Sequence, residues 1–234
     1  MHKKFVKTQN VKNFITLAND LQNRAEGLSG LALVYGEPGL GKSKTALWWA
    51  MNNNAVIISA KKSMTTRWLL EELVTELGEI PSYKTSDLYN QVVKKVLITQ
   101  PVIIVDEIDY LVSDKMAIEM LRDISDRTDC PVIMVGMHYA DKKLSRFRHL
   151  YDRFCEILKF ETFTYPDVQE IISQLSEVKI SEDAVQFAFQ NMNRMRQIVK
   201  LINKAETIAK ANDLTEIGLQ DLKKYILQIR RHIA

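Results

Sequence analysis

Hydrophobic residues along this chain occur in two kinds of pattern, short continuous runs and longer stretches with helical spacing. Continuous runs of this length are typical of strands buried on both faces of a sheet. They occupy residues 31–35, 55–59, 102–105 and 131–136, and residues 155–160 alternate toward a fifth strand. Helical spacing occupies residues 8–25, 42–51, 68–77, 86–98 and 117–124. Because strands alternate with helices, we predict an α/β fold with a five-stranded parallel sheet flanked by helices.

From Thr164 onward the pattern predicts helices only. Pro166 suits the first turn of one helix, and Ser181 precedes another with acids in its first turn. Residues 193–211 and 219–233 complete the helical segment. We therefore expect an N-terminal helix packed on the core (1–28), an α/β nucleotide-binding domain (29–161) and a small all-α C-terminal lid (162–234).

A glycine-rich segment follows the first predicted strand and precedes a helix. Its sequence, GEPGLGKS, matches G-x-x-x-x-G-K-[ST]. In this motif backbone N–H groups surround phosphates, the lysine reaches the β- and γ-phosphates, and the hydroxyl ligates Mg²⁺. The helix N-terminus adds a positive end to the site. The predicted nucleotide-binding residues are Gly36, Glu37, Pro38, Gly39, Leu40, Gly41, Lys42, Ser43 and Lys44.

Two acids, Asp106 and Glu107, end the third predicted strand. Open α/β sheets bind ligands at the carboxyl ends of their strands. In enzymes with such a phosphate loop, the first acid holds Mg²⁺ directly or through water. Glu107 is then placed to polarise the attacking water, a role that requires a charged acceptor within hydrogen-bond reach.

Composition excludes few functions, but charge is unevenly distributed. The 234 residues are 46% hydrophobic and 26% charged, which is ordinary for a globular protein, and the net charge is only +3. The first twelve residues carry four lysines and no acid, and the segment after Gln190 is also basic, whereas residues 161–190 carry six acids and one lysine. This charge distribution fits either a positive face that binds nucleic acid or ordinary solvated helix faces.

The two cysteines and the hydropathy indicate the compartment. Cys130 and Cys155 lack metal or redox spacing, so we expect core thiols in a reducing cytosol. No apolar run approaches the roughly 20 residues of a membrane span. A cytoplasmic protein without a membrane partner is expected.

The phosphate loop, the acidic strand end and the helical C-terminal segment together resemble the AAA+ ATPases. Residues 117–128, 131–137, 144–147 and 152–154 narrow this resemblance to the transposition ATPases related to the B protein of phage Mu, which are DNA-bound regulators of target choice. The resemblance extends over residues 8–211 and implies ATP and Mg²⁺ as cofactors. It implies Lys42 on the phosphates, Ser43 and Asp106 at Mg²⁺, and Glu107 as the catalytic carboxylate.

The resemblance also implies arginines that act on nucleotide. Arg146 corresponds to an arginine that reaches the γ-phosphate of a neighbouring subunit, with Arg148 and Arg153 as rivals. Arg196, with Arg194 as the alternate, corresponds to a lid arginine that touches nucleotide. Surface charge or salt bridging remains the alternative for each of them.

DNA contacts are expected just after the second predicted strand. Related ring and filament ATPases project residues from this position, here Lys61, Lys62, Thr65 and Arg67. Phosphate contacts of this kind give salt-dependent affinity with little sequence preference. A basic loop in water is the alternative.

The chain departs from the family pattern after its fourth predicted strand. Gly136 and Met137 occupy the place of the usual water-orienting polar residue, and His138 is a weak substitute. The N-terminal helix-turn-helix domain of the Mu protein is also expected to be absent.

The predicted function is an ATP-dependent DNA-binding regulator of transposition target choice and transposase activity. Its expected partners are double-stranded DNA, a transposase and further copies of the chain in a ring or helical filament. An initiator-like or helicase-loading ATPase and a nucleotide-gated scaffold that never meets DNA are the alternatives.

Overall fold

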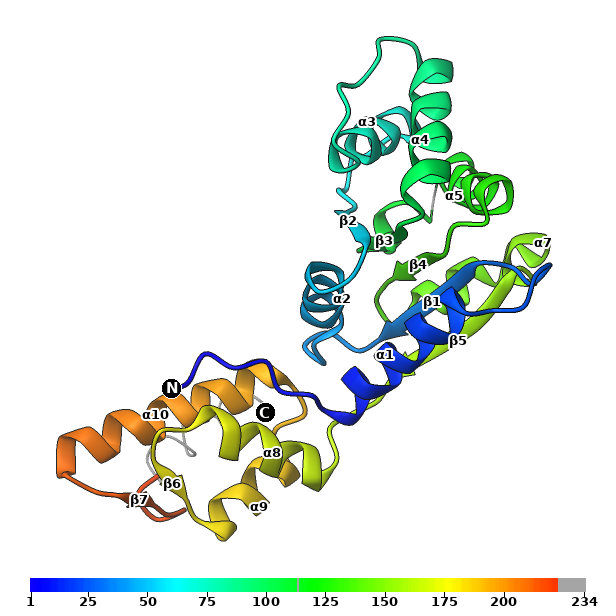
Figure 1. Cartoon of the computed structure of the whole chain (residues 1–234). Helices are drawn as coiled ribbons and strands as arrows, with labels where there is room; N and C mark the ends of the chain where they lie inside the picture. The colour runs from blue at the N-terminus through cyan, green and yellow to red at the C-terminus, as the bar shows by residue number, and fades with distance from the viewer. Residues whose placement is uncertain (113, 223–234) are drawn as a thin grey trace. The chain divides into compact units, whose positions relative to one another are not determined.

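A computed structural model describes residues 1–112 and 114–222, which fall into two compact units (Figure 1). The α/β unit comprises residues 13–160. The C-terminal unit comprises residues 1–12 together with the chain from residue 161 onward. The sequence placed residues 1–28 on the α/β core, whereas here the first twelve residues group with the C-terminal segment.

Three helices form most of the C-terminal unit: α8 (Tyr165–Leu175), α9 (Glu182–Asn191) and α10 (Met195–Asn212). Thr164 and Asp167 form a capping box at the start of α8, with a proline in its first turn. A short parallel pair, β6 (Lys179–Ile180) and β7 (Glu216–Ile217), adds strands to a segment where only helices were expected. Residues 219–222 form a turn, and the remainder of the helix predicted over 219–233 lies outside the described residues.

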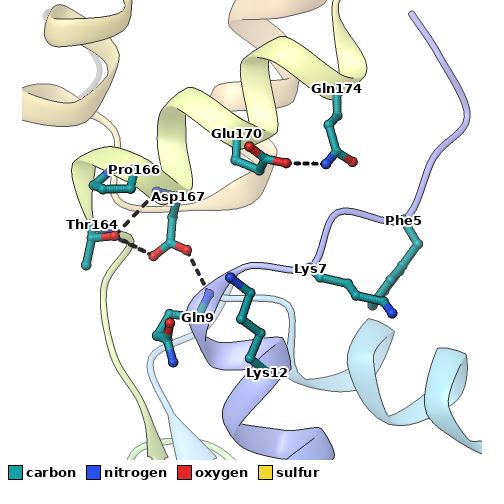
Figure 2. Close-up of a pocket in the computed structure, with 9 residues that line it drawn as sticks. All are labelled: Phe5, Lys7, Gln9, Lys12, Thr164, Pro166, Asp167, Glu170 and Gln174. Carbon is teal, nitrogen blue, oxygen red and sulfur yellow. Dashed lines mark hydrogen bonds between the residues drawn. The ribbon is translucent and has the colours of Figure 1, made fainter.

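The N-terminal segment of this unit packs along α8. The Gln9 backbone N–H donates to Asp167 Oδ1 at 2.7 Å, and the side chain of Asn10 bonds both the N–H and the carbonyl of Glu161. A pocket of about 680 Å³ lies between the segment and α8 (Figure 2). Its acids are already engaged, since Asp167 also accepts from Thr164 and Glu170 accepts from Gln174.

Five parallel strands form the sheet of the α/β unit, in the order β2-β3-β4-β1-β5 (Figure 1). They are β1 (Leu31–Gly36), β2 (Ala55–Ser59), β3 (Val102–Asp106), β4 (Val132–Val135) and β5 (Phe154–Phe160). The helices are α1 (Gln9–Gln22), α2 (Lys42–Met51), α3 (Thr66–Glu76), α4 (Thr85–Thr99), α5 (Lys115–Thr128), α6 (Ala140–Leu144) and α7 (Arg148–Tyr151), with a 3₁₀ turn η1 (Ile108–Tyr110). The predicted fold class is confirmed, and all carboxyl ends of the strands face one edge.

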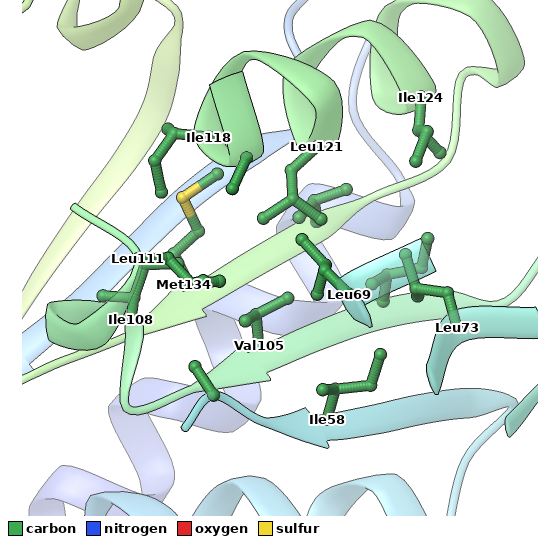
Figure 3. Packing of buried hydrophobic residues seen from close by; sticks show 14 of the residues in the cluster. Ile58, Leu69, Leu73, Val105, Ile108, Leu111, Ile118, Leu121, Ile124 and Met134 are labelled. Carbon is green, nitrogen blue, oxygen red and sulfur yellow. The ribbon is translucent and has the colours of Figure 1, made fainter. Parts of the chain in front are cut away.

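The core of the α/β unit lies between the central strands and the helices that follow them. Val105 and Met134 from the sheet meet Ile108 and Leu121, all fully buried (Figure 3). This packing explains why the central strands are continuously apolar, because both of their faces exclude water.

Only one of the two cysteines belongs to this core. Burial raises the pKa of the Cys130 thiol to about 12, and its Sγ lies 2.9 Å from the Pro101 carbonyl oxygen. Cys155 is exposed on β5, an edge strand, so the expectation of a second core thiol is wrong. An edge strand has only one neighbour, and here its side chains are mostly exposed.

Gly36 ends β1 where a side chain would collide with β5. Its φ is 152°, and a Cβ there would lie 2.7 Å from the Phe160 carbonyl oxygen. We expect Gly36→Ala to lower the free energy of unfolding by about 1–3 kcal/mol, measured by urea denaturation. Gly27→Ala is the matched control, because Gly27 also has a positive φ but faces open space. A loss no larger than that of the control would contradict the close approach of β1 and β5.

Candidate nucleotide-binding site

The phosphate loop, residues 36–43, connects β1 to α2. Gly39 and Gly41 have φ values of 88° and 95°, in the left-handed region that favours glycine. Thr45 then fixes the first turn of α2, because both its N–H and its hydroxyl donate to the Gly41 carbonyl. The loop therefore ends at a helix N-terminus whose free N–H groups can face an anion.

Lys42 lies buried behind this loop. Its ammonium donates to the carbonyls of Gly36 at 2.8 Å and Glu37 at 2.9 Å, and the residue is only 7% exposed. Burial lowers the Lys42 pKa, while the charges of Asp106, Asp109 and Glu37 act in the opposite direction. A phosphate bound here would offset the cost of burying this cation.

Asp106 and Glu107 end β3 at the same edge of the sheet. Asp106 is buried, and its Oδ1 accepts the Glu107 backbone N–H at 2.8 Å. Glu107 has a φ of 54°, unusual for a residue other than glycine, where the chain turns from β3 into η1. Burial raises the Glu107 pKa, and the charges of Asp106 and Asp109 raise it further. Of the two acids that end β3, Asp106 interacts electrostatically with the buried Lys42, which supports the expected polar site at this edge.

A third acid, Asp109, connects β3 to the segment after β4. Its Oδ2 accepts the Met137 backbone N–H at 2.6 Å. The approach is close, because a Cβ on Gly136 would lie 3.0 Å from the same oxygen. No role for Asp109 is predicted from the sequence, although its position three residues after Asp106 indicates that a further carboxylate belongs to this strand end.

His138, which follows β4, lies near Glu37 of the phosphate loop. Its Nδ1 lies 3.6 Å from Glu37 Oε1, beyond hydrogen-bond distance, and has no hydrogen-bond partner within the described part of the chain. The sequence marked His138 only as a weak water-orienting candidate. The structure places it next to a loop residue, and its role in hydrolysis stays a prediction.

The oxygen ligands here fit a magnesium ion bound together with nucleotide. Ser43 offers a hydroxyl in the first turn of α2, and Asp106 offers a carboxylate, both hard oxygen donors. Residues 1–112 and 114–222 contain no cluster of three His, Cys, Asp or Glu side chains that could hold a metal alone. Mg²⁺ commonly binds through one or two protein oxygens plus substrate phosphates, which is the chemistry available here.

The candidate trans arginines lie on the surface of the α/β unit. Arg146, Arg148 and Arg153 are all exposed in the segment from α6 to β5, and among the described residues none of them forms an ion pair. Their neighbour His149 contacts Glu119 at 3.1 Å. All three arginines are therefore accessible to a neighbouring copy of the chain, and their exposure favours none of them for the role in trans.

The lid arginines belong to the other unit. Arg194 caps α10 and Arg196 lies in its first turn, both exposed. Their contact with nucleotide stays a prediction.

Three of the four predicted DNA contacts have partners within the chain. Lys61 pairs with Glu72 at 2.5 Å, and Arg67 pairs with Glu71 at 2.8 Å. The side chain of Thr65 caps α3 by accepting the Trp68 N–H. Lys62 is exposed. A DNA phosphate would have to compete with acids for Lys61 and Arg67, so their predicted role needs a test.

Comparison with known proteins gives the family. The model described as "AAA domain" matches residues 25–144, more than half of the chain. The chain belongs to the AAA domain family. The family match confirms the resemblance seen in the sequence and the prediction of an ATP hydrolase domain.

The relatives found among characterised proteins carry the name ATP-dependent target DNA activator B. Those of Escherichia phage Mu and Escherichia phage D108 are each 26% identical to this AAA domain protein over 177 residues. The matched segment is 72% of this chain and 55% of each relative. The chain therefore spans about half the length of these relatives.

Solved structures share the fold. The Aeropyrum pernix ORC1 protein, solved in complex with DNA, has a TM-score of 0.63 at 16% identity, covering 98% of this chain and 67% of that one. A single-residue variant of Thermotoga maritima RuvB has a TM-score of 0.63 at 21% identity, covering 94% and 68%. At these identities the likeness establishes the fold of the AAA domain protein and nothing further.

Proposed function

We propose that this AAA domain protein binds duplex DNA in an ATP-dependent manner, assembles on it, and regulates the target choice and activity of a transposase. The observation that carries this proposal is the similarity to the phage target DNA activators, which extends over most of the chain. The phosphate loop and the β3 acids support the ATP dependence, because they place a buried cation beside carboxylates at one sheet edge.

In the proposed reaction, each residue of the site has a separate task. Lys42 and the loop N–H groups bind the phosphates, and Ser43 and Asp106 would hold Mg²⁺, which would neutralise phosphate charge. Glu107 accepts a hydrogen bond from the attacking water and orients it toward the γ-phosphate. Arg146, or one of its rivals, contributes charge from a neighbouring copy, so hydrolysis depends on assembly.

The predicted cytoplasmic location stays part of this proposal. None of the helices in the described part of the chain combines the length and apolarity that crossing a bilayer requires. The helicase-loading alternative shares the fold, but the likeness to ORC and RuvB structures does not favour it.

Electron microscopy with duplex DNA and a non-hydrolysable ATP analogue tests the proposal. We expect regular filaments or rings on the DNA, and none with ADP or without nucleotide. Arg146→Ala should weaken the assemblies if Arg146 reaches a neighbour. Isolated protomers on or off DNA under all conditions would contradict the proposal, and copurification with a replicative helicase rather than a transposase would favour the alternative.

A further inference from the structure

The loop between α3 and α4, residues 78–84, exposes two large apolar side chains. Ile80 is 88% exposed and Tyr83 is 90% exposed, the highest values among the large hydrophobic residues described. A single exposed apolar residue is ordinary, but two at the tip of one short loop call for an explanation.

Side chains from both flanking helices hold this loop in place. Gln91 of α4 accepts the Ser82 N–H and donates to the Ile80 carbonyl, both at 3.0 Å. Arg67 of α3 donates to the Tyr83 carbonyl. The loop is therefore ordered before any partner arrives, which lowers the entropic cost of binding through its tip.

Two acids near the tip are neutralised by ion pairs, and a third, Asp87, lies exposed in the first turn of α4. Glu71 and Glu79 are paired with Arg67 and Lys95, both at 2.8 Å. The Arg67 guanidinium also lies 5.7 Å from the centroid of the Tyr83 ring.

Two lysines flank this arrangement. Lys84 directly follows Tyr83, and Lys62 lies shortly before α3, whose first turn holds Arg67. Both lysines are exposed, and the described residues give neither of them an ion pair. An apolar tip flanked by available cations complements a polyanion that has apolar surface between its charges.

We propose that residues 78–84 enter the minor groove of duplex DNA, where Ile80 and Tyr83 contact base edges while Lys62 and Lys84 contact phosphates. Apolar side chains that enter this groove wedge against base steps, and isoleucine is among the residues used in this way. The proposal rests on the DNA binding proposed above. It reassigns Arg67 as a positioning residue that supports the Tyr83 backbone.

The salt dependence of DNA affinity separates the two kinds of contact. Each phosphate contact contributes about −0.9 to the slope of log K against log salt concentration, whereas an apolar contact contributes nothing to that slope. With labelled duplex and a non-hydrolysable ATP analogue, Tyr83→Ala should weaken binding about 5- to 150-fold at every salt concentration, with the slope unchanged. Lys84→Ala should reduce the slope by about 1.

Two further variants control this measurement. Tyr83→Phe keeps the aromatic ring and should bind nearly as well as the unaltered protein. Ile98→Ala removes an apolar side chain that is 70% exposed at the opposite end of α4, and it should have no effect. Because all these side chains are exposed, thermal unfolding should not distinguish the variants.

Four results would overturn the inference. Tyr83→Ala and Ile80→Ala could bind DNA as tightly as the unaltered protein, or Tyr83→Ala could change the slope as a lysine variant does. Loss of self-association without DNA in the same variants would instead identify a protein-docking loop. Absence of any DNA binding by the unaltered protein would overturn the proposed function as well, so the two failures are distinguishable.

Discussion

Replacing Lys42 with alanine should weaken nucleotide binding strongly. The lysine ammonium is buried and held by two loop carbonyls, Gly36 and Glu37, so it is fixed in place before the phosphates arrive. Truncating one partner of a buried charge pair costs about 2–5 kcal/mol, which corresponds to an affinity loss of about 30- to 5,000-fold. Isothermal titration calorimetry with Mg-ATP measures the loss.

The exposed lysine of α4 provides the control for this variant. Lys94→Ala removes the same charge from the surface of the same unit and should leave nucleotide affinity unchanged. Thermal unfolding of Lys42→Ala without nucleotide checks that the protein remains folded. A folded Lys42→Ala protein with unaltered ATP affinity would refute the assignment of the phosphate loop.

Replacing Glu107 with glutamine should stop hydrolysis while nucleotide still binds. Glutamine keeps the size of the side chain but lacks the negative charge that polarises water, and general-base contributions are about 10²- to 10⁴-fold in rate. Phosphate release measures turnover, and calorimetry measures ATP affinity. Normal turnover in this variant would remove Glu107 from its proposed role.

A matched variant separates Glu107 from its acidic neighbour. The Asp109 carboxylate accepts a hydrogen bond from the Met137 N–H, so one of its oxygens is already engaged within the chain. Asp109→Asn can keep an acceptor oxygen for that bond, so it should reduce turnover much less than Glu107→Gln does. Equal losses in the two variants would indicate that the loss comes from disturbed packing at the sheet edge.

The strands and the phosphate loop could be predicted because their signals are local. A central parallel strand is apolar throughout since both faces are buried, and the glycine spacing of residues 36–43 has few other uses. The order of the strands could not be read in this way, because β1 and β4 pair across a long stretch of sequence and the four continuous apolar runs look alike.

Features that depend on long-range contacts were missed. The contacts from Asp109 to Met137 and from His138 to Glu37 join segments that lie far apart in the chain. The short helices α6 and α7 lie in a charged segment too brief for a periodic pattern. Cys155 was misplaced because it was judged by residue type, although the alternation of residues 155–160 differs from the continuously apolar central strands.

Retention of duplex DNA by the Glu107→Gln protein, measured by fluorescence anisotropy with and without Mg-ATP, tests the account most directly. If nucleotide held between the phosphate loop and the β3 acids controls DNA binding, this variant stays on DNA in ATP, where the unaltered protein releases it as ATP is consumed. The variant should be free of DNA when nucleotide is omitted. Equal retention with and without ATP would contradict the account.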